Sequence, residues 1–384
     1  MVKKCALIHK SILLTRNLLL AAVALICCMC GRTAQKAEAG PESGPELMEE
    51  ASLLRIKAHD GYEEVAVYDG SDSTHVLARY FLVPDGGTSP AGADSEGVVL
   101  HVPLKSLVVD SEVYISAIKE LGAVDIVKGV FDAGYVTDPV LKAMLSDGRI
   151  GDMGSAGSPA NEKIMALRPD AVMVGHYPGM SASGIERLGF PIIRMTDIGE
   201  LSPLGRAEWI RFIGRLCGEG ERADSVFREV KRRYASIASA TLSGRKGKRP
   251  KVMLETTYQG VWYMAGGASY QARFISDAGG EYIYADDTTP GSLSLTFEQV
   301  LEKGRDADVW IIKSFGADMD KRGLLASDSR YSAFRPLREG GVYVCDTSVK
   351  PLYLETPFHP DLLLADYAAI FRGADSGRYF SRMK

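Results

Sequence analysis

The chain has 384 residues, 46% of them hydrophobic, and a formal net charge of −4 at pH 7 from 45 Lys and Arg against 49 Asp and Glu. This length and apolar content are enough for about two globular domains with hydrophobic cores. The basic residues are spread along the chain, so the charge pattern excludes the basic stripe of a nucleic-acid-binding protein.

The N-terminus has the pattern of an export signal. Four basic residues precede an apolar run at 18–30, which is too short to span a bilayer and is typical of a signal peptide. The stretch Leu25-Ile26-Cys27-Cys28 resembles a bacterial lipobox, so we expect a signal peptide over 1–27 and a lipid on Cys28. Cys30 is the alternative, with Met29 as an unusually large preceding residue, and a plain membrane anchor is a further one. Residues 28–50 are predicted to be a flexible tether, because they are rich in Ala, Gly, Glu and Pro without apolar periodicity.

The remaining cysteines do not indicate a disulfide framework or a zinc site. After Cys28, only Cys30, Cys217 and Cys345 follow, and their spacing suits neither. Cys217 falls in a helical pattern and Cys345 in a strand-like run. Both are predicted to be small, buried apolar residues.

Residues 51–200 are predicted to form an N-terminal α/β lobe. Two short β-rich runs, 64–69 and 75–83, indicate a hairpin at its edge. Strands and helices then alternate, which predicts a parallel sheet covered on both faces, with ligands bound beyond the carboxyl ends of the strands. The expected strands are 98–102, 125–130, 170–174 and 191–195, and the expected helices are 111–122, 138–145, 159–167 and 183–188.

Residues 201–243 are predicted to be a helical linker between two lobes. Apolar residues recur there at helical spacing in two runs separated by Gly218 and Gly220. At about 1.5 Å per residue, a helix from Glu221 to Ala240 would be about 30 Å long, enough to bridge two lobes. A surface helix on one large domain is the alternative.

Residues 244–384 are predicted to form a C-terminal α/β lobe. Strand-like runs occupy 251–255, 308–312 and 342–345, Gly260 supplies a turn, and a helix over 359–372 closes the chain.

The segment from Gly154 to Val174 carries a family resemblance. It is similar to a segment of class III substrate-binding proteins of ABC importers for ferric siderophores, heme and cobalamin, in which a glutamate and a basic residue begin a helix before a Leu-x-Pro-Asp turn and an apolar strand. One departure is that Asn161 directly precedes the glutamate, whereas the family often places Asn two residues before it. The matching residues here are Glu162, Lys163, Ile164, Leu167, Pro169 and Asp170.

The residues at the start of the helix predicted over 159–167 also have a purely structural interpretation. Ser158 can cap it, Pro159 suits its first position, and Glu162 lies in or next to the first turn, where the helix dipole favours a carboxylate. First-turn glutamates commonly have this structural role and no other.

The resemblance continues over nearly all of the mature chain. Residues 203–234 resemble the family's interlobe helices, and 261–280 resemble its segment from a cleft strand to the following helix. The resemblance implies two Rossmann-like lobes with mostly parallel sheets, joined by a long helix, with a cleft between them. Glu298 lies eight residues before Asp306, as Glu162 lies eight before Asp170. Because one glutamate from each lobe meets arginines of the permease dimer in that family, Glu162 and Glu298 are the expected docking residues.

Aromatic and polar residues follow the predicted strands of both lobes. A planar chelate needs stacking surface and a few polar groups, and Tyr and His can also ligate heme iron. Each residue alone is compatible with ordinary loop packing, and only the set indicates a binding surface. The expected ligand-binding residues are Phe131, Tyr135, His176, Tyr177, Tyr258, Trp262, Lys313, Phe315 and Tyr353.

Two other classes of function have weaker support. The sequence contains no nucleophile elbow, H-E-x-x-H pair, P-loop or dinucleotide-binding fingerprint, so we expect no enzyme and no resident cofactor. A zinc or manganese receptor needs about three histidines and a carboxylate. His101, His176 and His359 keep that alternative open, although the chain has no His-rich loop.

We therefore expect a monomeric, lipid-anchored receptor in the periplasm or cell envelope. It is expected to bind an iron chelate (a siderophore or heme) or a corrinoid and to deliver it to an inner-membrane ABC permease dimer with its ATPase subunits. A metal-ion receptor of related fold is the second hypothesis, and an exported enzyme the third.

Overall fold

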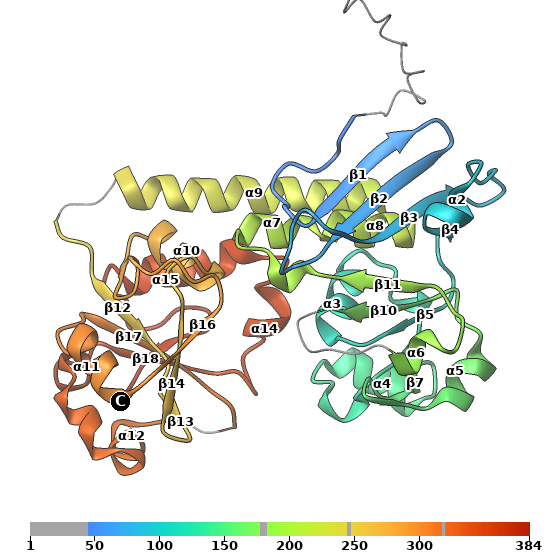
Figure 1. Ribbon diagram of the computed structural model, residues 1–384. Helices are drawn as coiled ribbons and strands as arrows, with labels where there is room; N and C mark the ends of the chain where they lie inside the picture. The colour runs from blue at the N-terminus through green and yellow to red at the C-terminus, as the bar shows by residue number, and fades with distance from the viewer. Residues whose placement is uncertain (1–44, 177–182, 244–246, 317–318) are drawn as a thin grey trace, which may run out of the picture. The chain divides into compact units, whose positions relative to one another are not determined.

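The computed structural model describes residues 45–176, 183–243, 247–316 and 319–384. Within these ranges, buried apolar residues form two large clusters. One cluster, with a smaller satellite beside it, gathers residues from Leu53 to Val230 together with Phe358, and the other gathers the remaining buried apolar residues from Tyr234 to Phe380. The two clusters are the cores of two α/β lobes (Figure 1).

A four-stranded sheet begins the N-terminal lobe. Its order is β1-β2-β3-β4, with β1, β2 and β3 antiparallel and β4 parallel to β3. The predicted hairpin is β2 and β3. The predicted strand at 98–102 is β4, but it joins this sheet, and only Leu100 in it is buried. The strands are β1 (Leu54–His59), β2 (Tyr62–Tyr68), β3 (Val76–Pro84) and β4 (Val98–Val102), and the short helix α2 (Ala93–Glu96) precedes β4.

The main sheet of this lobe is entirely parallel. Its order is β11-β10-β5-β6-β7. Its central strand, β5, has only three residues and was absent from the elements predicted from the sequence. The strands are β5 (Leu107–Val109), β6 (Val127–Val130), β7 (Gly151–Asp152), β10 (Ala171–Gly175) and β11 (Ile192–Met195), and the helices are α3 (Glu112–Glu120), α4 (Pro139–Ser146), α5 (Asn161–Leu167) and α6 (Ser183–Glu186).

Helix α5 begins two residues later than predicted. Ser158 and Pro159 form the short strand β9, which pairs with β8 (Gly154–Ser155). The residue before the helix is Ala160, which has no side-chain capping bond. The expected Ser158 cap is therefore wrong, because a two-residue hairpin takes up that backbone.

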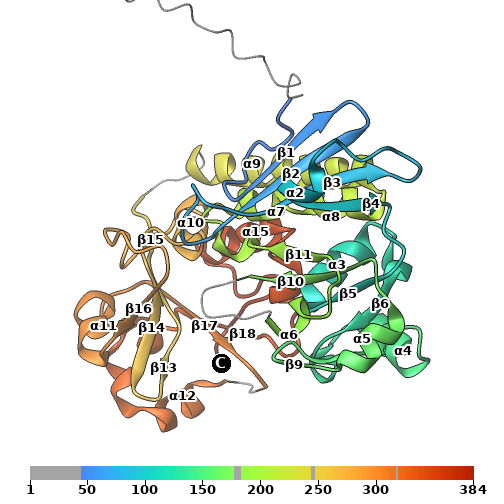
Figure 2. The same cartoon turned by 45° about the vertical axis from the view of Figure 1, so that its right-hand side comes forward.

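Three helices connect the lobes: α7 (Pro203–Glu208), α8 (Ile210–Cys217) and α9 (Gly220–Ser243). Helix α9 packs against both cores, with Phe227 and Val230 in the first and Tyr234 in the second. Figures 1 and 2 show it running along both lobes. The helix-linked fold is confirmed, while the domain boundaries at 200/201 and 243/244 stay predictions.

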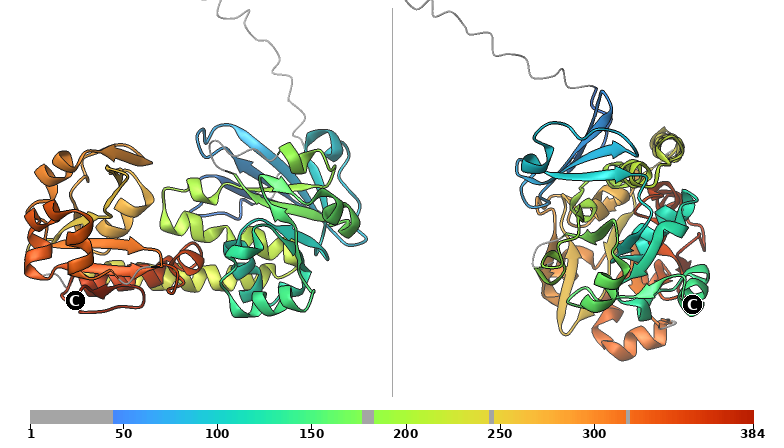
Figure 3. Two further views of the ribbon diagram at one scale, coloured as in Figure 1. Left: turned by 90° about the horizontal axis from the view of Figure 1, so that it is seen from below. Right: turned by 90° about the vertical axis from the view of Figure 1, so that its right-hand side faces the viewer.

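The C-terminal lobe repeats the α/β plan (Figure 3). Its main sheet has the order β15-β12-β17-β18-β19, with only β19 antiparallel, and β13, β14 and β16 form a small antiparallel sheet. The main strands are β12 (Lys251–Leu254), β15 (Glu281–Tyr282), β17 (Val309–Ser314), β18 (Val342–Asp346) and β19 (Ser381–Arg382). The small sheet has β13 (Thr257–Tyr258), β14 (Val261–Ala265) and β16 (Ser292–Leu295), and the helices are α10 (Tyr270–Asp277), α11 (Phe297–Gly304), α12 (Lys321–Ser327), α13 (Arg335–Glu339), α14 (Leu352–Glu355) and α15 (Pro360–Ile370).

Two buried glutamates fix the start of the folded chain. The Glu208 carboxylate accepts hydrogen bonds from the backbone N–H groups of residues 49, 50 and 51, at 2.7–3.1 Å. The Glu200 carboxylate accepts from the N–H groups of residues 52 and 53 and from the indole of Trp209. Both glutamates are at most 1% exposed. The predicted 28–50 tether therefore extends too far, because residues 49 and 50 are fixed by Glu208 and residues 46 and 47 are bonded to β1. Residues 28–44, with the lipidation site Cys28, lie outside the described residues.

Cys217 and Cys345 are buried, as predicted. Burial raises the pKa of the Cys217 thiol to about 12 and that of the Cys345 thiol to about 11. Within the described ranges, no helix is both long and apolar enough to cross a membrane.

Candidate functional site

Polar side chains occupy the carboxyl ends of the N-terminal lobe's parallel strands. Asp110 follows β5, and its Oδ2 accepts a hydrogen bond of 2.7 Å from the N–H of Gly175 at the end of β10. A Cβ on Gly175 would lie at an ordinary contact distance of 3.6 Å from the same carboxylate oxygen but only 3.3 Å from the Tyr114 hydroxyl, which would have to shift by a few tenths of an ångström. The Oδ1 atom of Asp110 is buried without a described partner.

Charges around Asp110 reinforce the effect of its burial. Desolvation first, and then the neighbouring charges of Asp197 and Asp132, raise the pKa of Asp110 to about 7, against a lowering hydrogen bond from Gly175. Asp197 itself is buried, accepts a 2.7 Å hydrogen bond from the Tyr114 hydroxyl and pairs at 2.9 Å with Arg206 of α7. This lobe therefore presents a polar network at the edge where parallel sheets bind ligands.

A partly buried ion pair lies at the equivalent edge of the C-terminal lobe. Lys313, near the end of β17, pairs with the Glu255 carboxylate, which follows β12. Burial alone would lower the pKa of Lys313, but the charge of Glu255 outweighs it and the pKa is raised. Glu255 has a positive φ of 57° and accepts the Trp310 indole N–H at its carbonyl, 2.7 Å away. Lys313 was predicted from the sequence, whereas its partner Glu255 was missed, because the two residues pair only after folding.

Four of the predicted aromatic residues are exposed. Tyr258, Phe315 and Tyr353 are 67%, 77% and 55% exposed on the C-terminal lobe, and Tyr135 is 80% exposed on the other. Apolar rings left in water at strand ends are available for stacking on a ligand. Their role in binding stays a prediction.

Trp262 and Phe131 do not fit the predicted role. Trp262 is fully buried, and its indole donates a 2.9 Å hydrogen bond to the Leu254 carbonyl. Its ring contacts four other rings at centroid distances of 5.7–6.0 Å. Phe131 is 2% exposed in the satellite core. The expectation that these two residues stack on a ligand is wrong, because packing within their own lobes covers both faces.

The remaining predicted ligand residues follow β10 in the sequence. His176 is half-buried, and its backbone N–H donates a 2.7 Å hydrogen bond to the Met195 carbonyl. Tyr177 lies outside the described residues, so its predicted role stays open.

The two predicted docking glutamates are both exposed in the first turns of helices, Glu162 on α5 and Glu298 on α11. The Glu298 carboxylate lies 3.2 Å from a guanidinium nitrogen of Arg330, whose guanidinium carbon is 4.1 Å from the ring centre of Phe297. An exposed ion pair of this kind contributes little to the stability of the protein. Glu298 can therefore exchange this partner for another cation at little cost.

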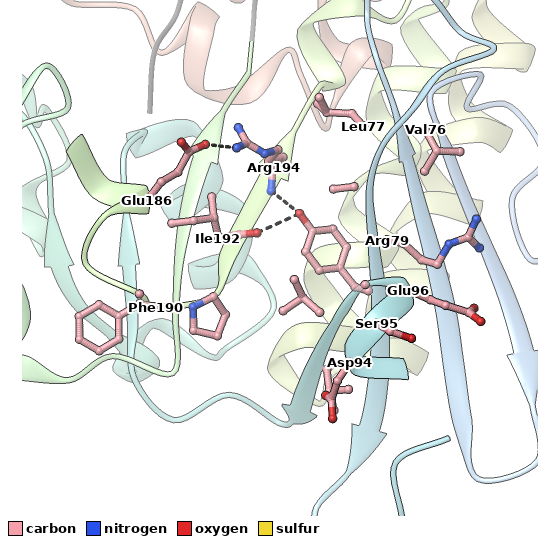
Figure 4. A pocket seen from close by; sticks show the side chains of 17 residues that line it. Val76, Leu77, Arg79, Asp94, Ser95, Glu96, Glu186, Phe190, Ile192 and Arg194 are labelled. Atoms are coloured by element: carbon pink, nitrogen blue, oxygen red, sulfur yellow. Dashed lines mark hydrogen bonds and ion pairs between the residues drawn. The ribbon is translucent and has the colours of Figure 1, made fainter. Parts of the chain in front are cut away.

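A cavity of about 920 Å3 lies elsewhere, between β3, β4 and the edge strand β11 (Figure 4). Across it the Tyr80 hydroxyl donates to the Ile192 carbonyl at 3.0 Å and accepts from the Arg194 N–H at 2.8 Å. Arg194 also pairs with Glu186. Tyr80 thus occupies the hydrogen-bonding edge of β11, and none of the predicted ligand-binding residues lines this cavity.

Histidines do not converge in the part of the chain that the structure places. Among the described residues, no three His, Cys, Asp or Glu side chains form a group that could hold a metal ion. His101 is exposed on β4, and His359 pairs with Glu120.

Comparisons with known proteins cover both lobes. Residues 108–349 match the family model described as periplasmic binding protein. Two uncharacterized lipoproteins of Methanocaldococcus jannaschii are similar. One is 26% identical over 365 residues, covering 91% of this chain and 90% of the relative; the other is 28% identical over 260 residues, covering 64% of this chain and 60% of the relative.

A solved structure supports the same fold. A periplasmic heme-binding protein from Pseudomonas aeruginosa superposes with a TM-score of 0.55 at 18% sequence identity. The match covers 73% of this chain and 98% of that protein.

Proposed function

Because the chain belongs to the periplasmic binding protein family, we propose that it is the solute-binding protein of an ABC-type importer. It captures an iron chelate, heme or a corrinoid and delivers it to a membrane permease. The ligand binds between the strand ends of the two lobes. The exposed aromatic residues at those ends carry this part of the proposal, because a planar or macrocyclic chelate is held chiefly by stacking on such rings.

The two lobes contribute different chemistry to this binding. On the C-terminal lobe, Tyr258, Phe315 and Tyr353 offer apolar surface, and the paired charges of Lys313 and Glu255 largely neutralise one another. The N-terminal lobe offers hydrogen-bonding groups around Asp110. A chelate with an apolar face and a polar periphery satisfies both sides.

Isothermal titration against hemin, cobalamin and several ferric siderophores tests the capture step. One of these is expected to bind, and Tyr258→Ala or Phe315→Ala to weaken that binding by about 1–3 kcal/mol, the usual range for an aromatic anchor. Leu242→Ala is the control, since Leu242 is 56% exposed at the end of α9. Absence of binding by every chelate, or equal losses in the control, contradicts the proposal.

Delivery is assigned to Glu162 and Glu298. Carboxylates exposed on helices of the two lobes can accept charge-assisted hydrogen bonds from arginines of a permease dimer. Reversing both to Lys is expected to abolish uptake in cells and stimulation of the permease ATPase while ligand affinity is unchanged. A structural role alone predicts a loss of only about 0.3–1 kcal/mol of stability per helix. Normal uptake by the double variant at normal protein levels contradicts the docking role.

A further inference from the structure

One aromatic side chain of the C-terminal lobe is packed in the core of the other lobe. Phe358 lies between α14 and α15, is 2% exposed and clusters with buried residues of the N-terminal lobe. The buried leucines on either side of it in the sequence, Leu352 and Leu363, belong to the C-terminal core. Helix α14 lies against α3 of the N-terminal lobe (Figure 1). The chain therefore crosses between the two cores at Phe358.

The next residue makes an ion pair across the same contact. His359 Nε2 lies 2.7 Å from Glu120 Oε2 at the end of α3, with side chains 19% and 35% exposed. The Glu120 backbone carbonyl accepts a 2.6 Å hydrogen bond from Arg222 of α9. The end of α3 is thus bonded both to the connecting helix and to the C-terminal lobe.

We propose that residues 356–359, the α14–α15 corner, form a second joint between the lobes besides α9, and that protonation of His359 strengthens it. Phe358 supplies an apolar contact that is independent of pH. The pair of His359 with Glu120 supplies a contact whose strength depends on the charge of the imidazole.

The charges around His359 leave Glu120 as its direct partner. Arg233 of α9 is paired with Asp361 of α15 at 2.7 Å, and Arg378 is bound to Glu355 of α14. Lys119 of α3 is paired with Asp138. Burial alone lowers the pKa of His359, but the hydrogen bond and charge of Glu120, with the charge of Asp361, outweigh burial and the opposing charge of Arg233. The net effect is a raised pKa.

The direction of the pH effect follows from that raised pKa. The protonated imidazole is favoured in the joined state, so the contribution of the pair is complete below the ordinary histidine pKa of about 6.5. It is lost as the pH rises through the raised value. The joint is therefore tighter in mildly acidic solution than in alkaline solution.

The contact between His359 and Glu120 is also open enough for its hydrogen bond to break when the pH changes. A cavity of about 330 Å3 lies beside it, lined by residues of α3, α14 and α15 that include Glu120 and His359. A pair with a cavity beside it can exchange its partner for water without unfolding either core. Tyr353 lies on the same α14 helix, so loosening the joint allows α14 to move and shifts a side chain that, under the proposed function, binds the ligand.

Hydrogen exchange of the full chain without ligand, purified in detergent, tests the joint separately from ligand binding. Protection factors, corrected for the intrinsic pH dependence of exchange, are compared between pH 5.5 and 8.5. Amides of α14 and of the end of α3 are expected to lose protection by about threefold to tenfold at the higher pH, as for a partly exposed charged hydrogen bond. His359→Gln and Glu120→Gln should each remove this dependence.

The chain supplies a matched control. His59 lies 3.4 Å from Glu64 inside one lobe, so His59→Gln should leave the α14 and α3 amides unchanged. Phe358→Leu should lower protection equally at both pH values. Constant protection in the unmodified chain, or equal effects of His59→Gln and His359→Gln, overturns the proposal. If the unmodified protein binds a chelate but its α14 and α3 amides show no pH-dependent protection, the joint is refuted and the proposed function is left intact.

Discussion

Replacing Trp262 with Ala should destabilise the C-terminal core selectively. The indole is fully buried among Phe297, Trp310, Tyr331 and Phe334, and large-to-small changes at such sites cost about 3–5 kcal/mol. The change also removes the hydrogen bond to the Leu254 carbonyl, and a buried acceptor left without a partner costs about 1–3 kcal/mol. These two effects overlap, so we expect a total near the upper end of the first range.

Hydrogen exchange measures this loss in each lobe separately, which a single melting temperature cannot do for a two-lobed chain. Amides of β12 and β17 should lose at least about 3 kcal/mol of protection, a factor of roughly 150. Amides of β5 and β10, in the other core, should be unchanged. Trp262→Phe keeps an aromatic ring but loses the hydrogen bond, and should cost about 1–2 kcal/mol.

The matched exposed residue is Tyr258, which is 67% exposed on the neighbouring strand β13. Tyr258→Ala should leave exchange within about 0.5 kcal/mol of the unmodified protein. If Trp262→Ala kept full protection in β12 and β17 but lost ligand binding, the assignment of Trp262 to the core would be refuted.

Three further predictions concern pH, the start of the fold and the anchor. Since the pKa of Asp110 is raised to about 7, the folded state binds more protons than the unfolded state between about pH 4 and 7, so stability should fall as pH rises through this window. In Asp110→Asn the midpoint of urea denaturation should depend less on pH across this window. The same pH dependence in the variant as in the unmodified protein would contradict the raised pKa. Glu208→Ala should cost about 3 kcal/mol, because three backbone N–H groups lose their acceptor, and exchange should rise first in residues 49–53; unaltered exchange there would argue against the carboxylate as their anchor. Cys28→Ser should move the protein from membranes to the soluble fraction, whereas acyl chains found on Cys30 by mass spectrometry would reassign the site.

Helices could be predicted where a capping motif or an apolar period is visible within a short stretch of sequence. Thr296 is the N-cap of α11, and its side chain and that of Gln299 bond each other's backbone N–H groups in a capping box, a signal visible in four residues. The apolar spacing of α9 likewise predicted a helix that contacts two cores. Strand β5 gave no such signal, because three residues are too few to show a period.

The site was harder to predict because its contacts are distant in sequence. Glu255 and Lys313 are on different strands, and nothing in either local sequence indicates the pair. Trp262 was predictable in principle, since β14 alternates buried and exposed residues, with Trp262 and Met264 inward and Tyr263 outward. The period of the strand determines which of its side chains face the core, whereas proximity to a strand end does not.

The attachment of residues 49–53 to Glu208 and Glu200 has a mechanical consequence. In a protein anchored through its N-terminus, tension first meets the short contact of residues 46 and 47 with β1, where the Leu47 N–H donates a 2.8 Å hydrogen bond to the Ile56 carbonyl, and then residues 49–53. The backbone N–H groups of these residues are hydrogen-bonded to the carboxylates of Glu200, just before α7, and Glu208, within α7. These hydrogen bonds must break before β1 can separate from β2. Once the contact of residues 46 and 47 with β1 has yielded, the load passes to the helical segment that connects the lobes, and the pairing of β1 with β2 in the four-stranded sheet is spared. Shortening the chain before residue 49 would leave this attachment intact, whereas deleting 49–53 would transfer the force directly to β1.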